Sequence, residues 1–221
     1  MPAIRAVVFD VGETLVDETS IWSDWADWLG VPRFTFLAAL GGVIARGLDH
    51  REAFGLIRPG LDPDAERRAR TAAGRRHHVT ADDLYPDAVS CLHALVTDGF
   101  RVGIAANQPR AVEPVLHSLG VPLALVASSE RWGVAKPEPA FFSRICDELE
   151  MPAPEIAYVG DRLDNDIGPA AAAGMVAVFV RRGPWAILQS ATVDPRSVGA
   201  AASIESLDEL PGVLRAMVAD R

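Results

Sequence analysis

Short apolar runs and longer segments of helical spacing alternate along most of the chain. The runs have the length of buried strands and lie at Ala3–Phe9, Val102–Ala106, Leu123–Ala127, Ile156–Val159 and Val176–Val180. Between them, Asp87–Asp98 and Pro137–Glu150 carry apolar residues three and four positions apart, which predicts amphipathic helices. Alternating strands and helices favour a parallel sheet covered by helices on both faces, a three-layer α/β fold. Ligands of such sheets bind beyond the carboxyl ends of the strands.

Residues 18 to 84 break this alternation with helical patterns alone. Trp22, Trp25 and Trp28 share one helical face, and Phe34–Arg46 and the arginine-rich Asp64–Arg76 form two further helical segments. We therefore predict an all-helical domain at residues 17–84, inserted into an α/β core domain formed by residues 1–16 and 85–221. The tryptophan stripe is expected to form the core of the inserted domain rather than a cage for a substrate.

The composition narrows the choice of partners. With 221 residues, of which 49% are hydrophobic and 23% charged, the chain resembles globular proteins with a sizeable core. A net charge of −9 argues against nucleic acid and anionic membrane surfaces as partners. No segment has the form of a signal peptide or approaches the roughly 18 apolar residues of a membrane span. We therefore expect a cytoplasmic monomer or homodimer that acts on a small molecule. Cys91 and Cys146 lack metal-ligand spacing, and the adjacent His77 and His78 are expected on a solvated surface rather than at a metal.

Polar residues stand where the predicted strands end. Asp10 ends the first strand, Asp161 follows the fourth, and Asp166 lies five residues further on. Carboxylates that converge on one crevice repel each other unless a cation lies between them, and oxygen ligands of this kind suit Mg²⁺. Lys136, the only lysine among 21 basic residues, precedes Pro137, which favours an extended backbone at the lysine. A lysine at this place would orient a nucleophilic carboxylate and offset the charge of a phosphoryl group.

Four stretches carry a resemblance to a known family. FDVGETL, VGIAANQ, VAKPEPAFF and YVGDRLDNDIGPAAAAGM resemble the four ordered motifs of the haloacid dehalogenase-like (HAD) hydrolase superfamily, over residues 3 to 182. The resemblance implies a Rossmann-like core with a helical cap and an activity as a hydrolase of phosphoric monoesters or acyl phosphates. It implies that Asp10 is the nucleophile and forms an aspartyl-phosphate, and that Lys136 steadies it and the phosphoryl oxygens. It also implies that Asp10, Asp161 and the backbone carbonyl of Gly12 bind Mg²⁺, with Asp166 supporting the metal through its waters.

Two positions depart from the pattern of the family's phosphatases. Gly12 stands where a second Asp serves as general acid and base, and Ala106 stands where a Ser or Thr hydroxyl contacts the phosphoryl group. The amide of Asn107 is the expected substitute in substrate binding, together with Lys136. A positioned general acid or base raises the reaction rate roughly 10²- to 10⁴-fold. One hydrogen bond to a charged group contributes about 1.5–3 kcal/mol, which corresponds to roughly 10- to 100-fold. The change at Gly12 is therefore the larger deficit.

Three explanations for Gly12 remain open from the sequence. The enzyme could expel leaving groups of low pKa, such as acyl phosphates, which depart without a proton. Glu13 or Asp17 could do the proton work instead. The chain could also be a silent binding or regulatory module that keeps the fold and the metal site.

Other branches of the superfamily also lack that Asp. The phosphonate-cleaving branch needs a second lysine, which this chain does not have. A dehalogenase-like activity is disfavoured because that branch typically lacks acids equivalent to Asp161 and Asp166. The expected function is therefore a Mg²⁺-dependent phosphatase acting on a small phosphorylated metabolite. Arg46, Arg51 or the tryptophan face could contact the substrate, and nothing in the sequence selects among them.

Overall fold

The computed structural model describes residues 3–75 and 79–219. The chain divides into two compact units, one formed by residues 1–17 and 80–221 and the other by residues 18–79. Residues 80 to 84 lie with the first unit, because Val16 and Leu84 form an antiparallel bridge and the Tyr85 amide donates to the carbonyl of Leu15 at 2.9 Å. His77 and His78 fall outside the described residues, so their expected place on the surface stays a prediction.

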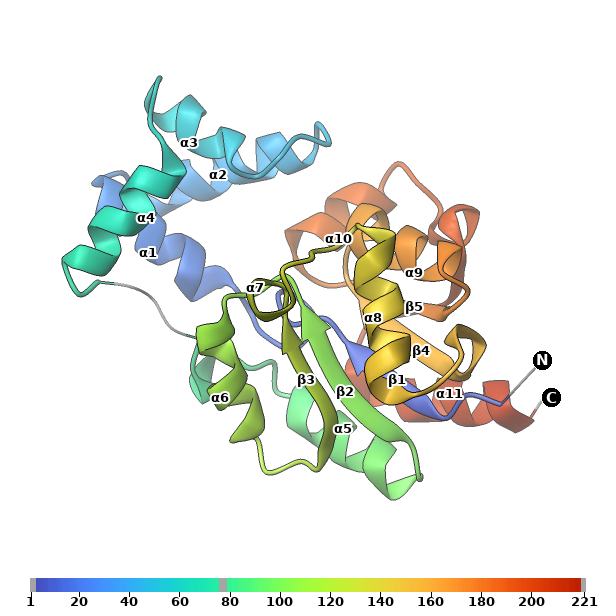
Figure 1. Ribbon diagram of the computed structural model, residues 1–221. Helices are drawn as coiled ribbons and strands as arrows, with labels where there is room; N and C mark the ends of the chain where they lie inside the picture. The colour runs from blue at the N-terminus through green and yellow to red at the C-terminus, as the bar shows by residue number, and fades with distance from the viewer. Residues whose placement is uncertain (1–2, 76–78, 220–221) are drawn as a thin grey trace. The chain divides into compact units, whose positions relative to one another are not determined.

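The first unit contains a parallel sheet of six strands in the order β3-β2-β1-β4-β5-β6 (Figure 1). The strands are β1 (Ala6–Phe9), β2 (Arg101–Ala106), β3 (Leu123–Ser128), β4 (Ile156–Gly160), β5 (Val176–Val180) and β6 (Ala200–Ile204). All five predicted strands are confirmed, as is the predicted parallel α/β class. β1 lies between β2 and β4 in the sheet and is completely buried. This central place puts the residue that follows β1 at the middle of the carboxyl edge.

Helices cover both faces of the sheet, which makes the three layers (Figure 1). The longer ones are α5 (Ala88–Thr97) and α11 (Leu210–Ala219) on one face and α8 (Pro139–Leu149) on the other, where the short α9 (Gly168–Ala172) also lies. The shorter ones are α6 (Glu113–His117), α7 (Ser129–Trp132) and α10 (Gly183–Ser190). The helix expected from Pro137 begins two residues later, at Pro139, because Lys136 and Pro137 form a turn. The buried side chains of α8 pack on the sheet beside Tyr158.

The second unit consists of α1 (Thr19–Leu29), α2 (Arg33–Ile44), α3 (Glu52–Ile57) and α4 (Pro63–Ala72). Its core contains Ala26, Leu29, Phe36 and Phe54, and the three tryptophans of α1 pack against this cluster. The ring of Trp25 meets that of Phe54 edge-on, with 4.9 Å between centroids. The tryptophan stripe thus contributes to the core of its own unit.

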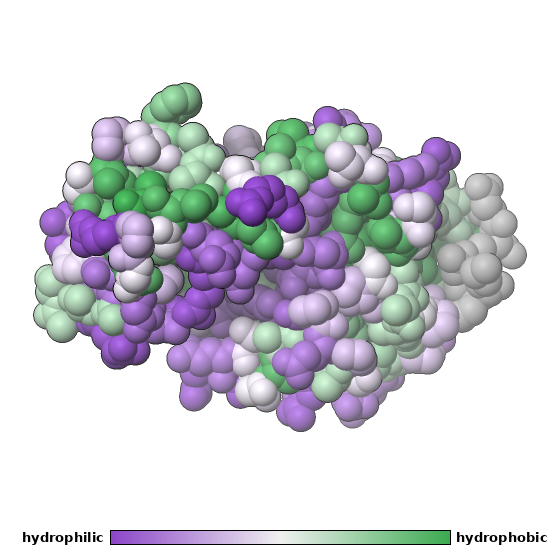
Figure 2. Space-filling model, turned by 90° about the horizontal axis from the view of Figure 1, so that it is seen from above, coloured by the Kyte–Doolittle hydropathy of each residue, from purple (hydrophilic) through white to green (hydrophobic). Residues whose placement is uncertain are grey.

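Some large apolar side chains remain at the surface. Phe34 at the start of α2 is 84% exposed and Leu56 in α3 is 58% exposed. Figure 2 shows hydrophobic residues beside hydrophilic ones on the face that it presents. Within residues 3–75 and 79–219, no helix combines the length and the apolar character that crossing a membrane requires.

Candidate active site

Three buried carboxylates meet at the carboxyl edge of the sheet. Asp10 directly follows β1, and Asp161 directly follows β4, the strand paired with β1. Asp166 lies in a π-helical turn, Leu163–Ile167, just beyond Asp161. One oxygen from each of the three lies within 4.8 Å of the others. The acids that are far apart in the sequence are therefore brought together.

The position of Asp166 depends on a glycine. A Cβ on Gly160 would lie 2.5 Å from the carboxyl carbon of Asp166, so only glycine leaves room for this carboxylate beside the end of β4. The backbone N–H of Arg162 donates to Asp166 Oδ2 at 3.0 Å. π-Helical turns are rare and occur frequently at functional sites.

Lys136 connects two of the three acids. Its Nζ donates to Asp10 Oδ1 and to Asp166 Oδ1, at 2.6 Å each, and the residue is only 4% exposed. The side chain of Asn107 fixes the lysine backbone, since its Nδ2 donates to the Lys136 carbonyl and its Oδ1 accepts from the Lys136 N–H, both at 2.8 Å. Asn107 therefore links the end of β2 to the lysine, and its expected contact with substrate stays a prediction.

The buried charges shift one another's proton affinity. Burial and the neighbouring carboxylates, that of Asp166 foremost, raise the pKa of Asp161 well above its ordinary value. Burial, together with Asp10, raises the pKa of Asp166 to about 6, although Lys136 pulls it down. Burial alone would lower the pKa of Lys136, but the adjacent Asp10 and Asp166 reverse this and hold it well above the ordinary value. The ammonium thus stays charged, whereas burial and mutual repulsion favour the protonated form of Asp161 when no cation lies between the carboxylates.

The arrangement fits a divalent cation. Oδ2 of Asp161 is buried and has no hydrogen-bond partner among the described residues. A buried polar atom without a partner is uncommon in native proteins and calls for a water or an ion. Three carboxylates against one ammonium leave a surplus of negative charge, and the ligands are hard oxygens, which suits Mg²⁺.

Glu13 occupies an unusual place directly after Gly12. Its backbone is left-handed, with φ of 52°, and the residue is 5% exposed. The hydroxyl of Tyr85 donates to Glu13 Oε2 at 2.6 Å, and Gly183 leaves space for this side chain because a Cβ there would lie 2.5 Å from Oε2. The other acid considered from the sequence, Asp17, donates its backbone N–H to the carbonyl of Asp83 at 2.8 Å.

Tyr85 is itself held by a charged pair. The Arg182 guanidinium lies over its ring at 4.4 Å from the centroid and donates to both oxygens of Asp87, at 2.9 and 2.8 Å. The interpretation of the sequence did not include Tyr85, Arg182 or Asp87. Tyr85 is separated from Glu13 by 72 positions, and Arg182 from Asp87 by 95, so no local pattern could reveal these contacts.

Comparison with known proteins finds a matching family and similar proteins. The sequence profile of haloacid dehalogenase-like hydrolases matches residues 4–174. A glyceraldehyde 3-phosphate phosphatase of Methanopyrus kandleri is 36% identical over 146 residues, which are 63% of this chain and 62% of the archaeal protein. The plasmid phosphoglycolate phosphatase of Cupriavidus necator is 28% identical over 220 residues, covering 95% of this chain and 92% of the relative.

A phosphoglycolate phosphatase of Rhodospirillum rubrum is 30% identical over 81% of this chain and 80% of its own. Among solved structures, a predicted phosphoglycolate phosphatase of Haemophilus somnus superimposes with a TM-score of 0.70 at 19% identity, covering 96% of this chain and 99% of its own. A dehalogenase superimposes with a TM-score of 0.67 at 21% identity, covering 96% of this chain and 98% of its own. At these identities the two structures demonstrate a shared fold.

Proposed function

We propose that this chain, which belongs to the haloacid dehalogenase-like hydrolase family, is a phosphatase that transfers the phosphoryl group of a small metabolite to Asp10. The observation that carries the proposal is the position of Lys136, which holds Asp10 and Asp166 at 2.6 Å beside the unpartnered oxygen of Asp161. The names of the relatives support the phosphatase reading, since both glyceraldehyde 3-phosphate and phosphoglycolate are small phosphate monoesters.

In the proposed reaction, a carboxylate oxygen of Asp10 attacks phosphorus while the bond from phosphorus to the leaving oxygen breaks. Water then attacks phosphorus, inorganic phosphate leaves, and the Asp10 carboxylate is regenerated. Lys136 orients Asp10 and offers positive charge to the phosphoryl oxygens, which gain charge during transfer.

Asp10, Asp161 and the backbone carbonyl of Gly12 would hold Mg²⁺ directly, and Asp166 would support it through its waters. When bound, Mg²⁺ supplies charge neutralisation for the transferred phosphoryl group. The raised pKa of Asp161 supports this assignment, because burial and the repulsion from neighbouring carboxylates both disfavour its ionised form when no cation is present.

The missing acid at position 12 limits the leaving groups. Glu13 is the candidate for general acid and base, because its charge raises the pKa of Asp161 and it is therefore close enough to act on the same site. Its carboxylate also accepts the Tyr85 hydroxyl, which keeps it in one place. We expect acyl and aryl phosphates to react faster than alkyl phosphates. Replacement of Glu13 by Gln should slow alkyl phosphates most, and an equal effect on all three classes would remove Glu13 from the mechanism.

Mass spectrometry after incubation with Mg²⁺ and acetyl phosphate tests the nucleophile directly. We expect a phosphoryl adduct on the peptide that contains Asp10, and hydrolysis of acetyl phosphate that the Asp10→Asn variant abolishes. An intact protein that forms no adduct and hydrolyses no activated phosphate would instead be a silent binding module.

A further inference from the structure

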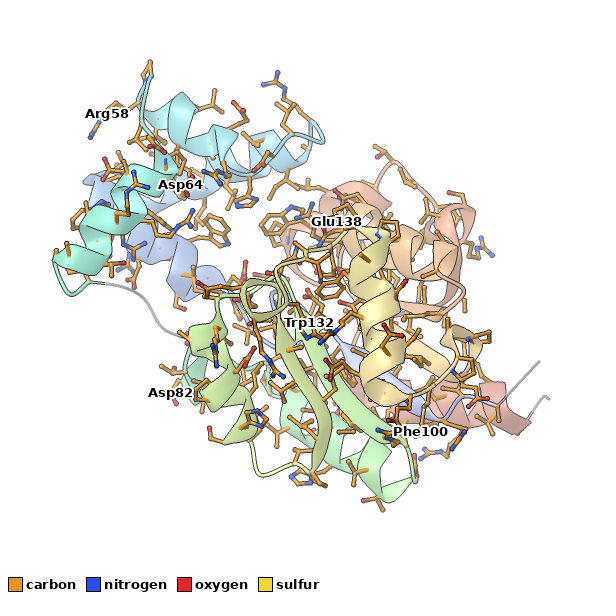
Figure 3. All side chains as sticks on the ribbon, viewed as in Figure 1. Arg58, Asp64, Asp82, Phe100, Trp132 and Glu138 are labelled. Carbon is orange, nitrogen blue, oxygen red and sulfur yellow. The ribbon has the colours of Figure 1, made fainter. Side chains whose placement is uncertain are left out.

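The π-helical turn that carries Asp166 is held from outside by one side chain of α10. This side chain is Gln189, near the end of the helix, and Figure 3 draws the side chains of α10 in the view of Figure 1. Its Oε1 accepts the backbone N–H of Leu163 at 2.8 Å, and its Nε2 donates to Oδ1 of Asp164 at 2.8 Å. One amide thus binds both the backbone and a side chain of the first two residues of the turn.

The backbone N–H of Leu163 needs such a partner. The first N–H groups of a helical segment find no acceptor within the segment itself. Leu163 is 5% exposed and packs in the hydrophobic core of the first unit. A buried N–H group without an acceptor is uncommon in native proteins. The Gln189 amide supplies the acceptor and therefore fixes the point at which the turn begins.

A chain of hydrogen bonds leads from Gln189 to the carboxylate of Asp166. The guanidinium of Arg162 donates to both oxygens of Asp164, at 3.1 and 2.8 Å, so Arg162 and Gln189 share this carboxylate. The backbone N–H of Arg162 donates to Asp166 Oδ2, and the carbonyl of Arg162 accepts the Asp166 N–H, each at 3.0 Å. A shift of the first residues of the turn would therefore also move Asp166.

A second residue of α10 contacts the same segment. Trp185 is 6% exposed, and its ring centre lies 5.4 Å from the guanidinium carbon of Arg162. A guanidinium near an aromatic ring is attracted by the ring quadrupole. Trp185 and Gln189 are four positions apart and so lie on the same face of the helix. This face of α10 is the one that meets the π-helical turn.

We propose that Gln189 is a positioning residue for the cation site, because it fixes the turn that holds Asp166 where this carboxylate can support Mg²⁺ through its waters. The inference rests on the proposed function and adds a residue to it. Groups around a metal are oriented by further hydrogen bonds, and the loss of such an outer partner typically weakens metal binding 10- to 100-fold. Gln189 is 26 positions from Leu163, so the sequence pattern gave no sign of this contact.

Mg²⁺ binding without substrate tests the inference apart from catalysis. Methionine has nearly the length of glutamine but lacks the amide. We expect the dissociation constant of Mg²⁺, measured by isothermal titration calorimetry, to rise roughly 10- to 100-fold in Gln189→Met. Ser190→Ala is the matched control, because Ser190 lies on the same helix and accepts from Arg181 at 3.3 Å, away from the turn. This control should bind Mg²⁺ as the wild type does. A Gln189→Met protein with the wild-type dissociation constant overturns the inference, even if urea unfolds it more easily.

A double-mutant cycle separates positioning from a general loss of structure. Asp166→Asn removes the negative charge through which Gln189 is proposed to act. Adding Gln189→Met to Asp166→Asn should therefore change the dissociation constant of Mg²⁺ much less than it does in the wild type, since the effects of coupled residues do not add. The same fold-change in both backgrounds would show that Gln189 acts independently of Asp166 and would overturn the inference.

The outcome for Gln189 is distinguishable from the outcome for the phosphatase. Mg²⁺ binding that depends on Gln189, in a protein that forms no phosphoryl adduct, would support the inference and contradict the proposed function alone. A phosphoryl adduct on Asp10 in a protein whose Mg²⁺ binding does not depend on Gln189 would overturn the inference and support the proposed function.

Discussion

Replacing Asp161 by Asn should stabilise the metal-free protein, although Asp161 belongs to the candidate active site. The carboxylate oxygens lie within 4.8 Å of one another, and two like charges at that distance repel by about 3–4 kcal/mol at an effective dielectric constant of 20. Uptake of a proton by Asp161 relieves part of this repulsion, as the raised pKa of Asp161 indicates. We therefore expect the free energy of unfolding to increase by about 1–3 kcal/mol, close to the usual cost of one unsatisfied buried polar group.

Urea denaturation at pH 7.5, followed by circular dichroism, measures the effect in the presence of a chelator and of Mg²⁺. Mg²⁺ at 100 times its dissociation constant should stabilise the wild-type protein by about 2.7 kcal/mol, and the Asp161→Asn variant far less. The order of stability should thus reverse between the two conditions. Asp164→Asn is the control: this carboxylate accepts from Arg162 and Gln189, each at 2.8 Å, so its loss should weaken the protein in both buffers.

The reasoning would be refuted by a wild-type protein that is more stable than Asp161→Asn in the chelator. A Mg²⁺ response of equal size in both proteins would likewise show that Asp161 does not hold the ion. Either result would remove the electrostatic argument for a cation between these carboxylates.

Further changes test other parts of the molecule. Lys136→Met should lower stability by about 3–5 kcal/mol in urea denaturation, because it leaves buried carboxylates unpaired, and phosphoryl adduct formation should be lost. Gly160→Ala should lower stability by about 1–3 kcal/mol and abolish the thermal shift caused by Mg²⁺, because the new Cβ displaces Asp166. Burial raises the pKa of Asp87, but its hydrogen bonds to Arg182, Ser206 and Leu207 outweigh this and lower the pKa below the ordinary value of 3.8. The stability that Asp87 contributes is therefore present above pH 3.8 and is lost as the pH falls through its folded-state pKa. Urea denaturation curves of the wild type and of Asp87→Asn should accordingly converge on acidification below pH 3.8. Burial raises the pKa of Cys91 to about 12, so the native protein should not react with a thiol reagent at this residue at pH 8, whereas the unfolded protein should.

The strand ends were the most predictable part of the molecule. In a parallel sheet the carboxyl ends of strands share one edge, so Asp10 and Asp161 could be expected close together before any coordinates were known. β6 was missed because its sequence, AAASI, contains a single large apolar residue, Ile204, and so lacks the apolar run that predicts a buried strand. A strand can thus be predicted from the sequence only where its side chains form a clear apolar run.

Contacts between distant residues were beyond prediction. The position of Glu13 depends on Tyr85, and nothing near either residue in the sequence records that contact. Arg70 belonged to a segment that looked uniformly basic, and periodicity could not show that its Nε is buried without a hydrogen-bond partner among the described residues, while Arg67 pairs with Asp64 at the surface. The pairing of charges is a property of the packed structure, because it depends on which side chains reach one another.

The solitary lysine of this chain also provides a reporter. An amine-reactive acylating reagent needs a free, uncharged amine, whereas Nζ of Lys136 is buried, charged and bonded to two carboxylates. Acylation at this position can proceed only when the site opens locally. No other lysine competes for the reagent. The rate of labelling of the peptide that contains Lys136 therefore measures how often the site opens in the unmodified protein.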